Sequence, residues 1–247
     1  MVTHQDILLQ LEMILQRMQS ACVRVGRSPD EVRLLLATKT VSADRIQVAL
    51  QAGQTLMGEN KVQEIKEKFD ALSGTPHETH FIGHLQTNKI KDILKYDVSC
   101  VQSLDRLDLA EKLNEKLQQA QRTLDVLIQV NTSGEVSKFG IHPEEAIALT
   151  RQVAKLPHLR VKGLMTIGLF SAEMAQVRPC FRLLRHLKEE ISALEIPNVS
   201  MCELSMGMSG DLEVAIEEGA TIVRVGTAIF GQRVYPDSYY WNEAGKS

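Results

Sequence analysis

The feature that most constrains the fold of this chain is a regular alternation of short apolar runs with longer amphipathic runs. The apolar runs are rich in β-branched residues and predict eight strands, at residues 32–39, 55–59, 79–85, 98–103, 124–131, 160–169, 199–204 and 221–230. Apolar residues at helical spacing predict a helix in each of the seven intervals. Strict alternation of strand and helix implies parallel strands with right-handed crossovers.

Eight such units favour a single α/β domain, a closed (β/α)8 TIM barrel over residues 1–232, followed by a tail at 233–247. An open doubly wound sheet is the alternative, but no GxGxxG motif follows the first strand. No helix is predicted after the eighth strand. An N-terminal amphipathic helix is predicted to take that place, or else to lie at the periphery or form a dimer contact. Its apolar stripe consists of Ile7, Leu11, Ile14, Leu15, Met18 and Cys22.

Composition and charge exclude several classes of protein. The chain has 28 Lys and Arg against 31 Asp and Glu, a net charge of −3, so we expect no nucleic-acid partner held by bulk positive charge. No apolar run reaches the roughly 18 residues of a membrane span, and the first residues lack a signal-peptide pattern, so we expect a cytoplasmic protein. The four cysteines form no CxxC pair, and His77 and His80 lack a third ligand, so no metal site is expected.

The ends of the predicted strands carry polar residues, which is where barrel enzymes place their chemistry. Lys39 follows the apolar run 34–38, so its amine is expected at a partly desolvated barrel mouth. Desolvation favours the neutral amine that forms a Schiff base with a carbonyl. Alternatively, Lys39 reaches solvent or pairs with an acid such as Glu59.

A second signal follows strands seven and eight. The turn 205–210 is rich in glycine and serine, and Gly226 and Thr227 lie at the end of strand eight. Backbone N–H groups and hydroxyls in such turns suit a phosphate, and TIM barrels usually bind phosphate there. The glycines are also explained by tight turns alone. A Schiff-base lysine with a phosphate site leaves two ligands, a phosphosugar or pyridoxal 5′-phosphate (PLP).

The motifs of the chain resemble one family in their order. The matching segments are Ala37-Thr38-Lys39-Thr40, 58–64, 80–86, Asn88-Lys89, Lys138-Phe139-Gly140, Gly163-Leu164-Met165, 204–209 and 223–231. They resemble the pyridoxal phosphate homeostasis protein family, of the YggS/PROSC type, over roughly residues 30–232. The sequence departs from the family pattern at 209–211 and 166–168.

The resemblance implies the barrel of the alanine racemase N-terminal domain and PLP linked to Lys39. It also implies that Asn60 borders the cofactor and that Arg224 faces the pyridine nitrogen. The phosphate would be held near two turns, formed by Ser205, Met206 and Gly207 and by Gly226 and Thr227.

An arginine can only donate hydrogen bonds, so Arg224 would favour an unprotonated ring nitrogen and a poor electron sink. The resemblance therefore implies a non-catalytic protein of PLP homeostasis that affects amino-acid metabolism indirectly. PLP and PLP-dependent apo-enzymes are its candidate partners, and we expect a monomer or weak dimer. The alternatives are a single-domain PLP-dependent racemase or lyase, for which we expect no second domain to supply a further base, and a Schiff-base aldolase.

Overall fold

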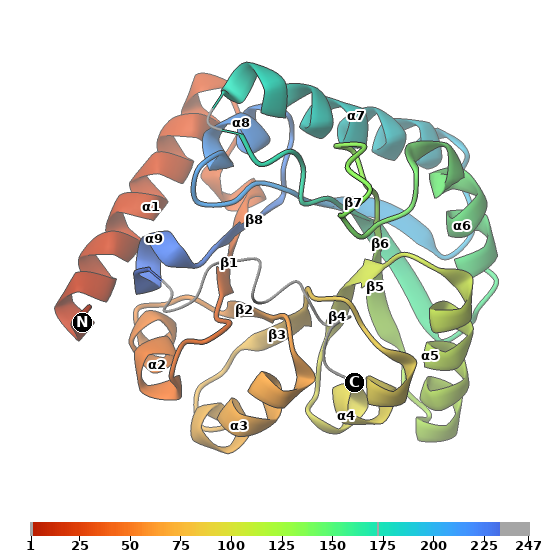
Figure 1. The fold of residues 1–247 in the computed structure, drawn as a ribbon, viewed down its shortest axis with the longest axis horizontal. Helices are drawn as coiled ribbons and strands as arrows, with labels where there is room; N and C mark the ends of the chain where they lie inside the picture. The colour runs from red at the N-terminus through yellow and green to blue at the C-terminus, as the bar shows by residue number, and fades with distance from the viewer. Residues whose placement is uncertain (1, 172, 233–247) are drawn as a thin grey trace.

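The computed structural model describes residues 2–171 and 173–232, and in it eight parallel strands close into a barrel in sequence order (Figure 1). The strands are β1 (Arg33–Ala37), β2 (Leu56–Glu59), β3 (Glu78–Phe81), β4 (Cys100–Leu104), β5 (Leu124–Gln129), β6 (Leu159–Met165), β7 (Val199–Ser205) and β8 (Ile222–Val225). Pairing of β1 with β8, in which Leu35 lies opposite Arg224, closes the barrel. The predicted TIM barrel is confirmed and the doubly wound alternative is wrong. The predicted tail at 233–247 lies outside the described residues.

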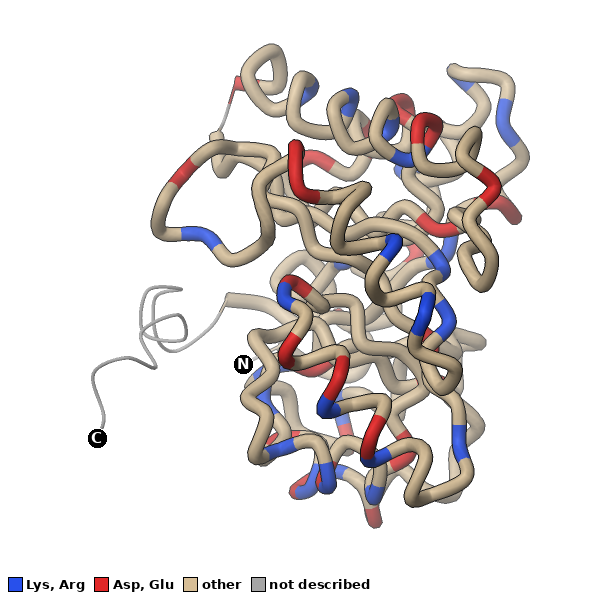
Figure 2. Tube along the Cα trace, turned by 90° about the vertical axis from the view of Figure 1, so that its right-hand side faces the viewer, with Lys and Arg blue, Asp and Glu red and all other residues tan. Residues whose placement is uncertain are grey.

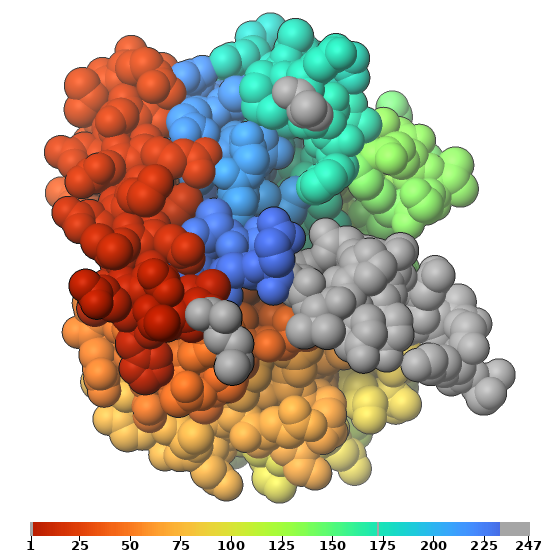
Figure 3. Space-filling view, turned by 60° about the vertical axis from the view of Figure 1, so that its left-hand side comes forward, coloured from red at the N-terminus to blue at the C-terminus, as the bar shows by residue number. Residues whose placement is uncertain are grey.

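A helix follows each of the first seven strands and covers the outside of the barrel. These helices are α2 (Ala43–Gln51), α3 (Val62–Leu72), α4 (Ile90–Lys95), α5 (Leu107–Ala120), α6 (Ala146–Val153), α7 (Met174–Ala193) and α8 (Leu212–Glu217). Helix α1 (His4–Arg24) lies between α2 and α8, beside the segment after β8 (Figures 1 and 3). It buries the predicted stripe except for Leu15, which stays partly exposed. The N-terminal helix therefore fills the eighth position, as predicted.

The inside of the barrel is partly polar. Strand residues alternate between the barrel interior and the helix layer, because side chains of a β-strand alternate in direction. Two small apolar clusters occupy the interior, Leu35 with Leu56 and Ile222, and Cys100 with Leu127 and Met165. Four buried polar side chains, linked by hydrogen bonds, lie on β3, β4, β7 and β8: His80, Gln102, Ser205 and Arg224. The main apolar core lies between the strands and the helices.

The eighth strand is shorter than predicted. It ends at Val225, and residues predicted to continue it form the short helix α9 (Thr227–Phe230). The chain turns at Gly226, where a Cβ would lie 2.7 Å from the carbonyl oxygen of Ala37. Only glycine permits this approach, and the turn places Thr227 at the barrel mouth while Phe230 stays buried in the core. The apolar run 221–230 is therefore half strand and half helix, a distinction that apolar content alone does not make.

The described surface mixes both signs of charge, and acidic and basic positions alternate along the face shown in Figure 2. None of the helices in 2–171 and 173–232 is long and apolar enough to cross a membrane. Over the same residues, no group of three or more histidine, cysteine or acidic side chains could hold a metal ion.

Candidate functional site

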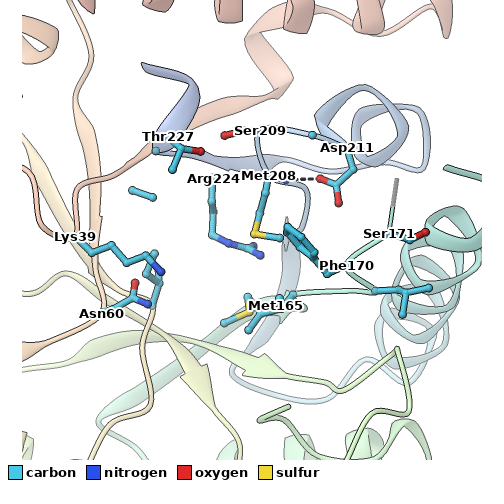
Figure 4. Close-up of a pocket in the computed structure, with 16 residues that line it drawn as sticks. Lys39, Asn60, Met165, Phe170, Ser171, Met208, Ser209, Asp211, Arg224 and Thr227 are labelled. Carbon is cyan, nitrogen blue, oxygen red and sulfur yellow. Dashed lines mark hydrogen bonds between the residues drawn. The ribbon is translucent and has the colours of Figure 1, made fainter. Parts of the chain in front are cut away.

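A cavity of about 470 Å³ opens where the strands end, at the carboxyl-terminal mouth of the barrel (Figure 4). Among its walls are five of the eight predicted site residues: Lys39, Asn60, Arg224, Gly226 and Thr227. The other lining residues are Ala37, Ile82, Met165, Ile167, Leu169, Phe170, Ser171, Met208, Ser209, Gly210 and Asp211. The side chain of Lys39, from the segment just after β1, and that of Arg224, from the neighbouring strand β8, extend into it.

Lys39 is held by the residues on either side of it. Its side chain is 8% exposed and points into the cavity next to Asn60 (Figure 4). Before it, the Thr38 hydroxyl donates to Glu59 Oε1 at 2.6 Å. After it, Thr40 has a φ of +62°, and its N–H donates to Glu64 Oε2 at 2.6 Å. A β-branched residue in this left-handed region stores about 1–3 kcal/mol of strain, which persists only where neighbours enforce it. The backbone that aims Lys39 is therefore fixed.

A buried ionic cluster lies beneath this segment. Glu59 is fully buried, and its Oε1 also accepts from Lys68 Nζ at 2.7 Å. Lys68 donates in addition to Glu64 Oε2 at 3.0 Å and to the Thr38 carbonyl at 2.8 Å. The acid that the sequence offered as a partner for Lys39 thus pairs with Lys68 on α3. Lys39 itself is almost wholly buried.

The stability of the protein is expected to fall as Glu59 loses its proton in the folded state. Burial raises the pKa of Glu59 to about 7, against the opposing effect of Lys68. The folded protein then holds a proton that the unfolded chain loses near 4.5, the ordinary value. The contribution of protonated Glu59 to the free energy of unfolding is fully present below pH 4.5 and is lost as pH rises through about 7. We expect Glu59→Gln to flatten this dependence, measured by urea unfolding at about pH 5 and about pH 8. If the free energy of unfolding changed equally between these pH values in the variant and in the wild-type protein, the role of Glu59 would be contradicted.

Arg224 presents a fixed cation to the same cavity. Its Nη1 donates to Ser205 Oγ at 2.8 Å, and its Nη2 donates to the Thr166 carbonyl at 2.7 Å. Burial lowers the pKa of Arg224 to about 10, opposed by the charge of Asp211. The guanidinium therefore stays charged at neutral pH. It offers the cavity only hydrogen-bond donors.

The glycine- and serine-rich turn divides into two parts. Ser205 and Met206 are fully buried and Gly207 has a φ of +90°, and none of the three lines the cavity. The residues that reach the cavity are Met208, Ser209, Gly210 and Asp211. The Ser205 hydroxyl is placed between Arg224 and Gln102, so the geometry does not favour its predicted contact with a phosphate. Ser209 instead lies near Thr227 at one end of the cavity (Figure 4).

Reasoning from the sequence missed the wall residues Leu169, Phe170 and Ser171, and it noted Ile167 and Asp211 only within departures from the family pattern. The segment after β6 contributes Ile167, Leu169, Phe170 and Ser171, although no polar motif marks it. Asp211 lies at the start of α8, and its Oδ1 accepts from the Met208 N–H at 2.5 Å. Burial raises the pKa of Asp211. A signal was available for Asp211, since residues 209–211 depart from the family pattern beside the predicted phosphate turn.

The sequence of this chain is similar to one protein family and to a curated relative along most of its length. The profile of the family "Alanine racemase, N-terminal domain" matches residues 14–234. A pyridoxal phosphate homeostasis protein of Aquifex aeolicus is 45% identical over 226 residues, which cover 92% of this chain and 98% of that protein.

Two solved structures resemble the barrel closely. An unknown protein from Bifidobacterium adolescentis has a TM-score of 0.87 and 38% identity, and the match covers 92% of this chain and 95% of that chain. PipY of Synechococcus elongatus PCC7942, solved with PLP bound, has a TM-score of 0.78 and 32% identity, covering 88% of this chain and 100% of that chain.

Proposed function

This chain belongs to the pyridoxal phosphate homeostasis protein family, whose barrel is the alanine racemase N-terminal domain, and from that premise we propose that it binds PLP as a Schiff base with Lys39. Its function would be to hold the cofactor for intracellular PLP homeostasis and so to affect amino-acid metabolism indirectly. The observation that carries the proposal is the convergence of the Lys39 amine and the Arg224 guanidinium in one cavity. When bound, PLP supplies the aldehyde that joins the amine.

The residues of the cavity fit this group. About 470 Å³ lies within the range of about 300–1,000 Å³ that is typical of small-molecule sites. Ile82, Met165 and Phe170 offer apolar surface for a planar ring. Arg224 would donate to the ring nitrogen, and Asn60 would border the ring beside Lys39, as the family resemblance implies.

The phosphate would lie at the end of the cavity formed by the two turns. Ser209 and Thr227 offer hydroxyls there, and the backbone N–H groups of Gly210 and Gly226 are candidates for the remaining hydrogen bonds. This arrangement keeps the predicted pair Gly226 and Thr227. In the other turn it moves the contact from residues 205–207 to residues 208–210.

Loss of the phosphate is expected to weaken binding strongly, and this result tests the proposed function. In titrations followed by the visible absorbance of the bound cofactor, PLP should bind much more tightly than pyridoxal. Thr227→Val removes one hydroxyl and should weaken PLP binding by about 1.5–3 kcal/mol, the value of a hydrogen bond to a charged group. Pyridoxal is the internal control, because it lacks the group that Thr227 would contact. Equal affinity of the wild-type protein for PLP and pyridoxal would refute the phosphate site.

The proposal extends to the partners, the compartment and the oligomeric state of the protein. PLP-dependent apo-enzymes are the candidate partners, because a homeostasis protein exchanges its cofactor with proteins that use it. We propose that the exchange takes place in the cytoplasm and that the protein acts as a monomer or weak dimer. The racemase or lyase alternative predicts turnover of amino acids, which the binding function does not.

A further inference from the structure

A chain of hydrogen bonds crosses the barrel interior from the cavity toward the opposite mouth. Arg224 Nη1 contacts Ser205 Oγ at 2.8 Å, and Ser205 Oγ contacts Gln102 Oε1 at 2.6 Å. Gln102 Nε2 then contacts His80 Nδ1 at 2.7 Å. His80 Nε2 lies 3.6 Å from Glu78 Oε2, which faces a small polar cavity at the amino-terminal mouth. Side chains from four strands therefore link Arg224 to the carboxylate of Glu78 at the far end of the barrel.

The donors of this series of hydrogen bonds all point in one direction, from Arg224 toward His80. A guanidinium cannot accept, so Ser205 accepts from Arg224 and gives its own single proton to Gln102. The carbonyl oxygen of Gln102 is thereby used, and its NH₂ group faces His80. Because an amide nitrogen only donates, Nδ1 of His80 must be unprotonated. The proton of a neutral His80 then sits on Nε2, toward Glu78.

The reverse orientation would leave a buried group without a partner. If Gln102 were turned over, its NH₂ would face Ser205, which already accepts from Arg224. The Ser205 proton would then lose its acceptor in a fully buried position, at the cost of an unsatisfied polar group. The permanent charge of Arg224 therefore selects the amide orientation of Gln102 and, through it, the tautomer of His80.

We infer that Ser205, Gln102 and His80 are positioning residues for Arg224, holding its guanidinium in one orientation toward the cavity from across the barrel. The inference rests on the proposed function, in which Arg224 faces the ring nitrogen of PLP. Hydrogen bonds in such a chain strengthen one another, because each donor polarises the next. Loss of the acceptor on His80 would free Gln102 to turn over, and the Ser205 hydroxyl that accepts from Nη1 would lose the acceptor that fixes its own proton.

The first experiment needs no cofactor. In ¹⁵N-labelled, PLP-free protein, NMR should find His80 protonated on Nε2 and bare on Nδ1. The Nη hydrogens of Arg224 should give separate signals, because two bonds restrain the guanidinium. His80→Leu and Gln102→Leu should merge these signals. His80→Asn is the matched control, since an asparagine oxygen can take the place of Nδ1 as acceptor, and it should keep them separate.

The second experiment uses protein loaded with PLP whose ring nitrogen is labelled with ¹⁵N. His80→Leu and Gln102→Leu should still join PLP through Lys39, with about tenfold weaker affinity, the lower end of the effect of a hydrogen bond to a charged group. The visible absorption maximum and the ring ¹⁵N shift should move in both variants and stay near wild type in His80→Asn.

Two results would overturn the inference: a wild-type His80 protonated on Nδ1, or Arg224 and ring-nitrogen signals that are the same in the leucine and asparagine variants. The tautomer of His80 is measured on the wild-type protein, so the inference can still be refuted if a leucine variant fails to fold. A wild-type protein that takes up no PLP would instead refute the proposed function, while the signals of the PLP-free protein would still decide whether His80 positions Arg224.

Discussion

Lys39→Ala is expected to abolish the visible absorbance of the PLP-loaded protein and all cofactor that borohydride can fix to the chain. Only a primary amine forms the Schiff base, and among the described residues that line the cavity Lys39 alone carries one, so none of the others can replace it. The fold should persist, because the Lys39 side chain extends into a cavity and is not part of the apolar core. Absorption spectra before and after reduction, with peptide mapping, measure the loss, and circular dichroism monitors the fold.

A neighbouring lysine provides the control for this experiment. Lys61 belongs to the loop after β2 and lines a smaller cavity, so Lys61→Ala should keep the chromophore. In the wild-type protein, the reduced cofactor should be found in the peptide that contains Lys39. A cofactor mapped to another lysine would refute the assignment.

Amino-acid turnover is expected to lie orders of magnitude below that of a racemase. Racemisation needs a proton donor or acceptor on each face of the α-carbon, or one base that reaches both faces, and Lys39 could serve one face. Among the described wall residues the other titratable side chains are Arg224 and Asp211. Arg224 has a pKa of about 10 and stays protonated, and Asp211 is bonded to the Met208 N–H. A positioned proton-transfer group contributes about 10²–10⁴-fold, so its absence leaves slow chemistry at most.

Arg224 lowers the expected rate further. A residue that only donates keeps the ring nitrogen unprotonated, which weakens stabilisation of a carbanion. We therefore expect alanine, serine and threonine to be neither racemised nor cleaved at enzyme-like rates. Exchange of the α-hydrogen in deuterated solvent, followed by chiral analysis, measures this. Rapid exchange with inversion that disappears in Lys39→Ala would favour the racemase over the binding protein.

The sequence by itself determined the architecture and the position of Lys39 at the mouth of the barrel. Strand and helix periods are local properties, and an eightfold alternation has few parallel solutions. Lys39 was recognised because it directly follows a buried run, and the end of a strand defines the mouth of a barrel. Family motifs added Asn60 and Arg224, which the structure brings to the same cavity.

The tertiary structure alone decided which polar residues meet. Ser205 and Gln102 are 103 residues apart, and the stagger of the closed barrel places their inward side chains at hydrogen-bonding distance. For the same reason His80, weighed from the sequence as half of a loose metal pair, contacts Gln102, while His77 Nδ1 contacts the Thr75 carbonyl. Within the 205–210 turn, the positive φ of Gly207 precedes the residues that face the cavity, so Ser205 points inward and Ser209 lines the mouth. Spacing along a chain cannot report these contacts, because strand register and turn geometry depend on the closure of the whole barrel.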